Sequence, residues 1–317
     1  MISRRSILVA AALLLLTATC AHGQTLATPT PADVMDNARA AAATTAIDHK
    51  SLPFEPDEQL TFEGEFSKLL LRGIEIAEFR FTTGRIAAEP ASAAVNVGAR
   101  TPVNDNTPHP DVSPITPPAN FLFKGDAAAK GWFRKLFGVD FHFHVESVVD
   151  AQRFHVLRTT KLDEQGKRVR TSEAVFDRAR NSVTWTERNP QNPSAQPRVV
   201  AAPLNGATQD FVSVIYFLRT QKLMPGHSLE LVVSDSGAVY RVPARVVERK
   251  RLKTVVGKVQ TLRIDLDIFG ANRLVDGKGQ MSLWLTDDQR HLPVRARVSN
   301  DLGTIDITLK KVSRGGN

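Results

Sequence analysis

Apolar residues recur at every second position along most of this chain, which is the period of a β-strand with one buried face. The segment 75–81, EIAEFRF, shows this alternation clearly. Turn residues recur about every ten positions, which favours a meandering antiparallel sheet over βαβ units. The expected strands are 59–66, 69–83, 139–149, 153–162, 167–176, 182–187, 228–234, 238–249, 258–269, 279–286, 292–300 and 304–312.

One segment, 207–224, follows a helical period instead. Its apolar stripe at positions i, i+3, i+4 and i+7 consists of Phe211, Val214, Ile215 and Leu218. Asp210 can cap the first turn, and Pro225 with Gly226 can end the helix. The predicted fold is mainly β: a curved antiparallel sheet, either an incomplete barrel or a β-roll, that partly wraps this amphipathic helix. A closed barrel and a two-sheet sandwich also remain compatible with the strand pattern.

Three segments interrupt the regular pattern. Residues 86–118 are rich in Pro, Ala, Asn and Thr and are expected to form a disordered loop. Residues 189–203 read as a second Pro- and Asn-rich connection. Residues 121–137 mix aromatic and basic side chains. They predict either a basic amphipathic helix on a membrane surface or a short helix packed on the sheet edge, and the second is favoured because most aromatic side chains are buried.

The N-terminus has the three parts of a secretory signal. Arg4 and Arg5 precede an apolar run at 7–16, and Ala21-His22-Gly23 supplies small residues at a cleavage site. The predicted organisation is a signal peptide at 1–23, a flexible leader at 24–50, a single β-rich domain at 51–313 and a tail at 314–317. The general secretory route is favoured over twin-arginine export and over lipidation of Cys20, because Thr19 precedes that cysteine.

Export sets the expected location and excludes several chemistries. The protein is expected in the periplasm, with no transmembrane segment once the signal is cleaved. Cleavage removes Cys20, the one cysteine, and so excludes disulfides and thiolate sites. No motif for a cofactor is present, and none is expected. The formal charge is +8, and removal of Arg4 and Arg5 with the signal peptide lowers it by two, to +6. This positive charge favours lipid or lipopolysaccharide as partners, whereas nucleic acid is not expected outside the cytoplasm.

An ordered series of motifs resembles one bacterial exported family. The motifs are DFVSVIYFLRT at 210–220, LMPG at 223–226, KGQMSLWLTDD at 278–288 and HLPVR at 291–295. Together they resemble the family named domain of unknown function 3108, which implies an envelope protein with no established reaction. The tract 284–295 is also similar to outer-membrane lipoprotein carriers and related periplasmic domains. That second resemblance implies an incomplete barrel that holds acyl chains around helices.

These observations predict a non-enzymatic binding module for a lipid-like ligand or an envelope protein partner. Phe211, Ile215, Leu218 and Trp284 are the candidate lining residues, and Arg219 could reach an anionic headgroup at the cavity mouth. Plain core packing explains the four apolar residues equally well. A separate basic cluster, a candidate anion site or simply a solvated hairpin, consists of Arg249, Lys250, Arg251 and Lys253.

Two other function classes remain open. His142, His144 and Glu146 alternate along one strand and therefore share one face, where they could bind a transition metal in a hydrolase-like protein. An ordinary polar outer face explains the same pattern. The third class is a structural assembly factor that acts by pairing at a sheet edge.

Overall fold

The structure of the protein is a computed structural model that describes residues 52–87, 119–131, 134–135 and 138–314. The expected signal peptide, the leader and nearly all of the expected loop at 86–118 lie outside the described residues. Within the described ranges, no helix is both long and apolar enough to cross a membrane.

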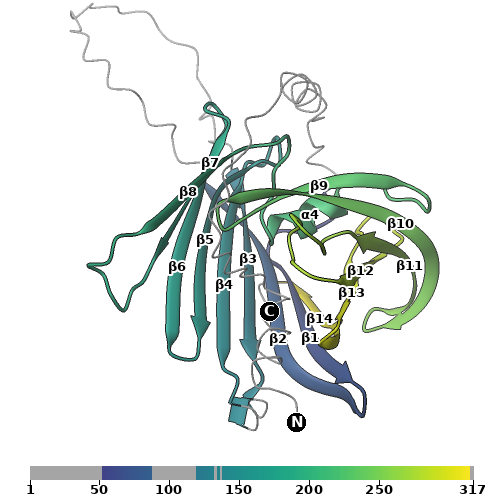
Figure 1. The fold of residues 1–317 in the computed structure, drawn as a ribbon. Coiled ribbons are helices and arrows are strands. Elements are labelled where there is room, and N and C mark those ends of the chain that lie inside the picture. Colours follow the sequence, from purple (N-terminus) through teal and green to yellow (C-terminus); the bar gives the residue numbers. More distant parts are fainter. Residues whose placement is uncertain (1–51, 88–118, 132–133, 136–137, 315–317) are drawn as a thin grey trace, which may run out of the picture.

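Fourteen strands in the described part of the chain form one antiparallel sheet (Figure 1). The strands of the N-terminal half are β1 (Glu58–Lys68), β2 (Leu71–Ala87), β3 (Ala119–Ala129), β4 (Phe141–Val149), β5 (Val156–Gln165), β6 (Arg168–Asp177), β7 (Ser182–Arg188) and β8 (Arg198–Pro203). After the helix α4 (Ser213–Arg219) come β9 (Ser228–Asp235), β10 (Ala238–Thr254), β11 (Gly257–Leu266), β12 (Gly279–Thr286), β13 (Pro293–Asn300) and β14 (Gly303–Arg314).

The sheet consists of two antiparallel meanders that join edge to edge at β1 and β14. Its order runs from β8 down to β1, and then from β14 down to β9. Neighbours in the sheet are therefore neighbours in sequence, except at the join, where β1 pairs with β14. The edge strands β8 and β9 do not pair with each other, so the sheet stays open. The prediction of a curved antiparallel sheet with one helix is confirmed.

Curvature nonetheless brings the two ends of the sheet together at one corner. Gly237, in the turn between β9 and β10, has φ +82°, and a Cβ atom placed on it would lie 2.6 Å from Cβ of Val200 in β8. Only glycine fits both this backbone conformation and this approach. Beside the corner, the free edge of β9 pairs with Gln209, whose N–H donates to the carbonyl of Val232 at 2.8 Å. The concave face is thereby closed off at this side.

The helix lies inside the concavity and is much shorter than the sequence predicts. The predicted segment spans 207–224, whereas α4 spans Ser213–Arg219. The residues before it bond to the sheet instead of continuing the helix: Arg178 Nη1 donates to the carbonyl of Gly206 at 2.9 Å and Nη2 to that of Thr208 at 3.1 Å. The predicted cap is confirmed, because the carboxylate of Asp210 accepts the first backbone N–H groups of the helix.

Two of the predictions for irregular segments are wrong, the first of them only in part. Residues 121–129 belong to strand β3, not to a helix, because the buried positions from Phe121 on recur at every second residue. The described residues 131, 134 and 135 are helical. Phe121, Phe123 and Ala127 lie on the buried face, and Lys124 lies between them on the other. The connection expected at 189–203 contains the edge strand β8, whose apolar residues are consecutive and therefore show no alternation.

Three clusters of buried side chains fill the concave face. The first lies on β1 to β4 and β12 to β14 and includes Leu60, Phe62, Phe79, Phe143 and Ile305. The second lies on β9 to β12 and includes Val233, Val246, Leu262 and Ile264. The third is aromatic and includes Phe54, Phe121, Phe123, Phe154 and Tyr216. Helix α4 joins the last two, since Leu218 belongs to the second cluster and Tyr216 to the third.

Candidate ligand-binding cavity

A cavity of about 240 Å³ lies between α4 and the concave face of the sheet. Protein interiors contain few voids larger than a water molecule, so this one is unusual for a packed core. Its walls come from both halves of the sheet and from the helix, and they are mostly apolar. They include Phe62, Phe79 and Phe143 from the first half, Leu231, Met281 and Val298 from the second, and Phe211, Val214 and Ile215 from the α4 segment.

Part of the cavity wall is polar. Lys161 of β5 lines it, with Ser172 of β6 directly opposite in the sheet. Asp235 and Ser236, from the turn after β9, line it as well. Burial raises the pKa of the Asp235 carboxyl group, and the nearby ammonium group of Lys161 partly opposes that rise. Asp126, Thr159, Asp210, Ser234 and Arg295 line it too. The cavity thus combines a long apolar wall with a mixed set of polar and charged side chains, among which Lys161 and Arg295 are the cations.

The structure places three of the five predicted ligand-binding residues on this wall. Phe211, Ile215 and Leu218 line the cavity. Trp284 does not. It lies opposite Arg263 and Arg295 in the neighbouring strands, with the Arg295 guanidinium 5.2 Å from its ring centre, whereas the preceding residue, Leu283, lines the cavity.

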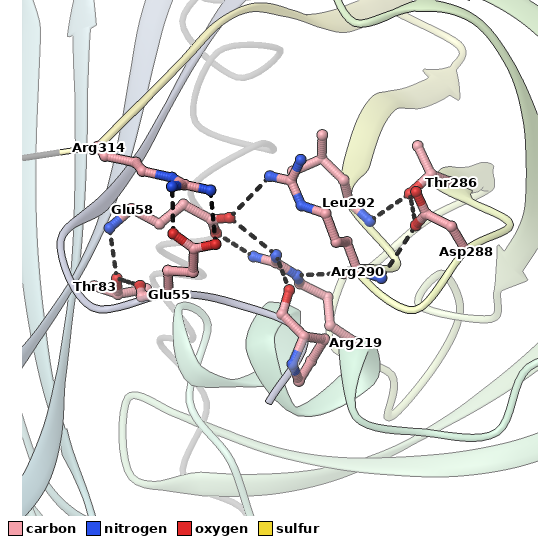
Figure 2. Close-up of polar contacts among 10 residues, drawn as sticks. Glu55, Glu58, Thr83, Arg219, Thr286, Asp288, Arg290, Leu292 and Arg314 are labelled. Atoms are coloured by element: carbon pink, nitrogen blue, oxygen red, sulfur yellow. Dashed lines mark hydrogen bonds and ion pairs between the residues drawn. The ribbon is translucent and has the colours of Figure 1, made fainter. Parts of the chain in front are cut away.

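Arg219 is also absent from the cavity wall, because its guanidinium is fully buried in another network (Figure 2). Nη1 donates to Glu58 Oε1 at 2.5 Å, and Nη2 donates to Glu58 Oε2 at 3.2 Å. Nη2 also donates to the carbonyl of Pro53 at 2.6 Å, and Nε donates to that of Arg290 at 3.1 Å. Four acceptors therefore share the five donors of this guanidinium.

The same network ties the end of α4 to two distant parts of the sheet. Glu58 begins β1, and its backbone N–H donates to Thr83 Oγ1 at 3.0 Å. The turn between β12 and β13 contributes Arg290, whose Nη2 lies 3.4 Å from Glu58 Oε2. His291 Nδ1 lies 2.8 Å from the carbonyl oxygen of Arg219 itself. The helix C-terminus is thus fixed to both halves of the sheet.

A second buried charge fixes the start of the helix. Asp210 Oδ1 accepts the backbone N–H groups of Val212 at 2.9 Å and Ser213 at 2.8 Å. Asp210 Oδ2 accepts the hydroxyl groups of Ser147 in β4 and Thr159 in β5. The sequence predicts the cap but gives no sign of the two hydroxyl donors, which come from distant strands. Together, Asp210 and Arg219 hold α4 at the cavity.

The candidate metal residues lie where the alternation places them, on one face of β4, and His144 Nε2 lies 3.4 Å from Glu146 Oε1. Each of the three side chains also has a closer partner on a neighbouring strand. His142 Nδ1 lies 2.8 Å from Glu164, His144 Nδ1 lies 2.7 Å from Asp126, and Glu146 binds Lys124 at 2.6 Å. Among the described residues, no group of three or more His, Cys, Asp or Glu side chains is arranged to hold a metal ion.

The candidate anion residues Arg249, Lys250, Arg251 and Lys253 are exposed on β10, far along the sheet from the polar part of the cavity wall. Arg249 forms an ion pair with Asp287. They therefore form a surface feature separate from the cavity.

Comparison with known proteins identifies the family. The family model described as "Protein of unknown function (DUF3108)" matches residues 112–310. The chain belongs to this family. No curated protein matches this DUF3108 chain. Among solved structures, it is similar to a beta-barrel-like protein of domain of unknown function DUF1849 from Brucella abortus, at 8% identity and a TM-score of 0.45. That similarity covers 82% of this chain and 98% of the other.

Proposed function

We propose that this DUF3108 protein is an exported, periplasmic binding protein that holds an apolar, lipid-like ligand against α4. The observation that carries the proposal is the cavity of about 240 Å³ in an otherwise packed concave face. Ligand pockets in proteins are concave and mostly apolar, with a few placed polar groups. The wall around Phe211 and Ile215 has this composition, and Lys161 supplies a polar group.

The size of the cavity limits the ligand. An engineered apolar cavity of about 150 Å³ binds benzene. The larger cavity here has room for a larger apolar group, such as one segment of an alkyl chain. A longer chain would have to extend out of the cavity.

Lys161 suggests which end of such a ligand carries charge. An amphiphile with an anionic end would place its headgroup at the ammonium group, where Ser172 offers a hydroxyl donor. The apolar chain would then lie along Phe211, Val214 and Ile215 on the helix side. An uncharged amphiphile would gain only the second set of contacts.

Calorimetric titration of delipidated protein with saturated fatty acids of increasing length tests the proposal. Each methylene that enters the cavity contributes about 0.8 kcal/mol, so affinity should rise up to about fourfold per methylene and then level off when the cavity is full. Ala174→Phe, which adds a ring at the cavity wall, is the matched variant that should abolish binding while keeping the fold. Absence of binding at every chain length would contradict the proposal.

Comparison of decanoate with decanol, which has the same chain length, tests the role of Lys161. Lys161→Met should weaken decanoate binding about tenfold, since it removes one charge-assisted contact, and leave decanol binding unchanged. Equal loss for both ligands would mean that Lys161 only shapes the wall.

Export itself is part of the proposal. Cleavage after Gly23 would give a mature protein that starts at Gln24 in the periplasmic fraction. Intact-mass measurement of that fraction tests this directly, and an uncleaved protein in the cytoplasm would contradict it.

A further inference from the structure

The hairpin between β10 and β11 extends past the strands that flank it. On the β10 side, backbone pairing ends at Val246, which bonds to residues 226 and 227. On the β11 side, pairing with β12 stops at Gln260. Its carbonyl accepts the N–H of Asp287, the residue that follows β12. Residues 250–259, here named the basic arm, pair only with other residues of the same β10–β11 hairpin. In Figure 1 these strands curve around the right of the view.

The basic arm has an excess of positive charge. It carries Lys250, Arg251, Lys253 and Lys258, all exposed, and no acidic residue. None of the four forms an ion pair with a carboxylate of the described chain, whereas Arg249 at the base pairs with Asp287.

The cations of the arm gather mostly on one face. Arg251 and Lys253, two positions apart, point to the same side, and Lys258 lies directly opposite Lys253 in the ladder. Like charges directly opposite each other destabilise a strand pair. Leu252, on the other face, packs against the first core cluster. The arm is thus anchored on one face and electrostatically repulsive on the other, and a negatively charged surface would relieve that repulsion.

The two-residue turn at the tip of the basic arm is apolar, which is unusual for a β-hairpin turn. Val255 and Val256 form the two-residue connection, with 53% and 39% of their surface exposed. Two-residue hairpin turns favour Asn, Asp and Gly because these residues adopt the required backbone conformations and are well solvated. The equivalent connection between β9 and β10 is Ser236-Gly237, which follows that preference. Solvation and turn geometry therefore give no reason for two valines here.

We propose that the basic arm docks on an anionic phospholipid surface, with Val255 and Val256 in the interfacial layer and Arg251, Lys253 and Lys258 against lipid phosphates. Unpaired lysines are depleted at protein interfaces, which makes a protein partner the poorer fit for this face. A lipid surface accepts clustered cations together with a small apolar tip.

The hairpin between β1 and β2 provides a matched control. Its connection also consists of two apolar residues, Leu69 and Leu70, with 86% and 98% of their surface exposed. The end of β1 beside this connection pairs with the start of β14. From there the pairing crosses the sheet to the end of β13, the start of β12 and finally the end of β11. In register, this connection lies at the end of the sheet opposite to the basic arm.

Cosedimentation with vesicles of phosphatidylglycerol and phosphatidylethanolamine, at low and at high salt, tests the proposal. The full chain should bind these vesicles and not vesicles of phosphatidylcholine alone, and salt should weaken binding because it screens exposed charges. Each cation near an anionic surface contributes about fivefold in affinity, so the triple variant R251Q/K253Q/K258Q should lose on the order of 100-fold. V255S/V256S should lose about tenfold, since it removes only the apolar contact.

The control variant L69S/L70S should bind the anionic vesicles as tightly as the wild-type protein does. Circular dichroism of each variant checks that the sheet is intact. Failure of the full chain to bind anionic vesicles at low salt would overturn the proposal, and so would full binding by the triple variant. Loss of binding in L69S/L70S with retention in V255S/V256S would also overturn it, because docking would then belong to the other end of the sheet. None of these outcomes depends on a ligand in the cavity.

Discussion

Replacement of Arg219 by methionine should destabilise the protein more than almost any other single change to a charged residue. The side chains of Arg219 and Glu58 are 0% and 4% exposed, so their ion pair is almost completely removed from water. Removing one member of such a pair costs about 3–5 kcal/mol, because the remaining charge stays buried. In Arg219→Met, Glu58 keeps only Arg290, a half-exposed partner at 3.4 Å. We therefore expect a loss of about 4 kcal/mol.

The double variant E58L/R219M separates the pair from its members. Both charges are removed, and apolar replacements of buried ion pairs are often neutral or stabilising. We expect the double variant to be more stable than Arg219→Met alone, by at least about 2 kcal/mol, since the two residues interact directly. Arg180→Met is the control, because its side chain is 85% exposed and pairs with Asp177 at 3.6 Å. It should change stability by less than about 0.5 kcal/mol.

Urea unfolding followed by tryptophan fluorescence measures these differences, provided that the slope of each transition stays constant. A free energy of unfolding for Arg219→Met within about 1 kcal/mol of the wild-type value would contradict this expectation. The single variants E58L and R219M are measured beside the double variant. If E58L/R219M lost as much free energy of unfolding as the two single variants together, the two side chains would have no coupling energy, and the expectation would be wrong.

Three further predictions concern other buried groups. Asp210→Ala should cost about 3 kcal/mol in urea unfolding, because it leaves two hydroxyl and two backbone donors without their acceptor; a loss below about 1 kcal/mol would contradict its anchoring role. Tyr216→Phe should keep or raise stability by about 1 kcal/mol, since the buried Tyr216 hydroxyl has no hydrogen-bond partner in the described part of the chain; a clear loss would reveal an unrecognised partner. Lys130 lowers the pKa of Glu63 from 4.5 to about 2, so this pair should add about 1–3 kcal/mol above pH 4.5 that disappears as the pH falls toward 2. Glu63→Gln should flatten stability across that pH window, and an unchanged slope would disprove the assignment.

Much of the sheet could be predicted from the sequence because its strands are half-buried and alternate in polarity. The segment 75–81 falls inside β2, where buried Ala77 and Phe79 alternate with Glu78 and Arg80, whereas a register shift against β1 leaves the consecutive residues Ile76 and Ala77 both buried. Strand β3 was missed because its aromatic residues stand close to lysines, a mixture that also suits an amphipathic helix. Edge strand β8 was missed because an edge needs little burial and therefore leaves little pattern.

The candidate site was harder to predict, because its parts meet only through long-range contacts. Phe211 and Ile215 follow from the helical stripe, but whether a stripe faces packed core or a cavity depends on side chains from distant strands. Glu58 lies 161 positions before Arg219, and nothing local marks either as a buried partner. Nothing in the sequence distinguishes Lys161 from a solvent-facing strand lysine, and only the curvature of the sheet places it on the cavity wall. The overall helix length was overestimated because Gln209 pairs with β9 rather than extending the helix.

Native mass spectrometry of the protein purified from its native host shows whether the cavity beside α4 holds a ligand. The wild-type protein should carry a bound acyl species, whereas Ala174→Phe, with the cavity wall filled, should carry none. Identical ligand-free masses for both proteins, after purification without detergent, would contradict the claim that the cavity beside α4 is a ligand site.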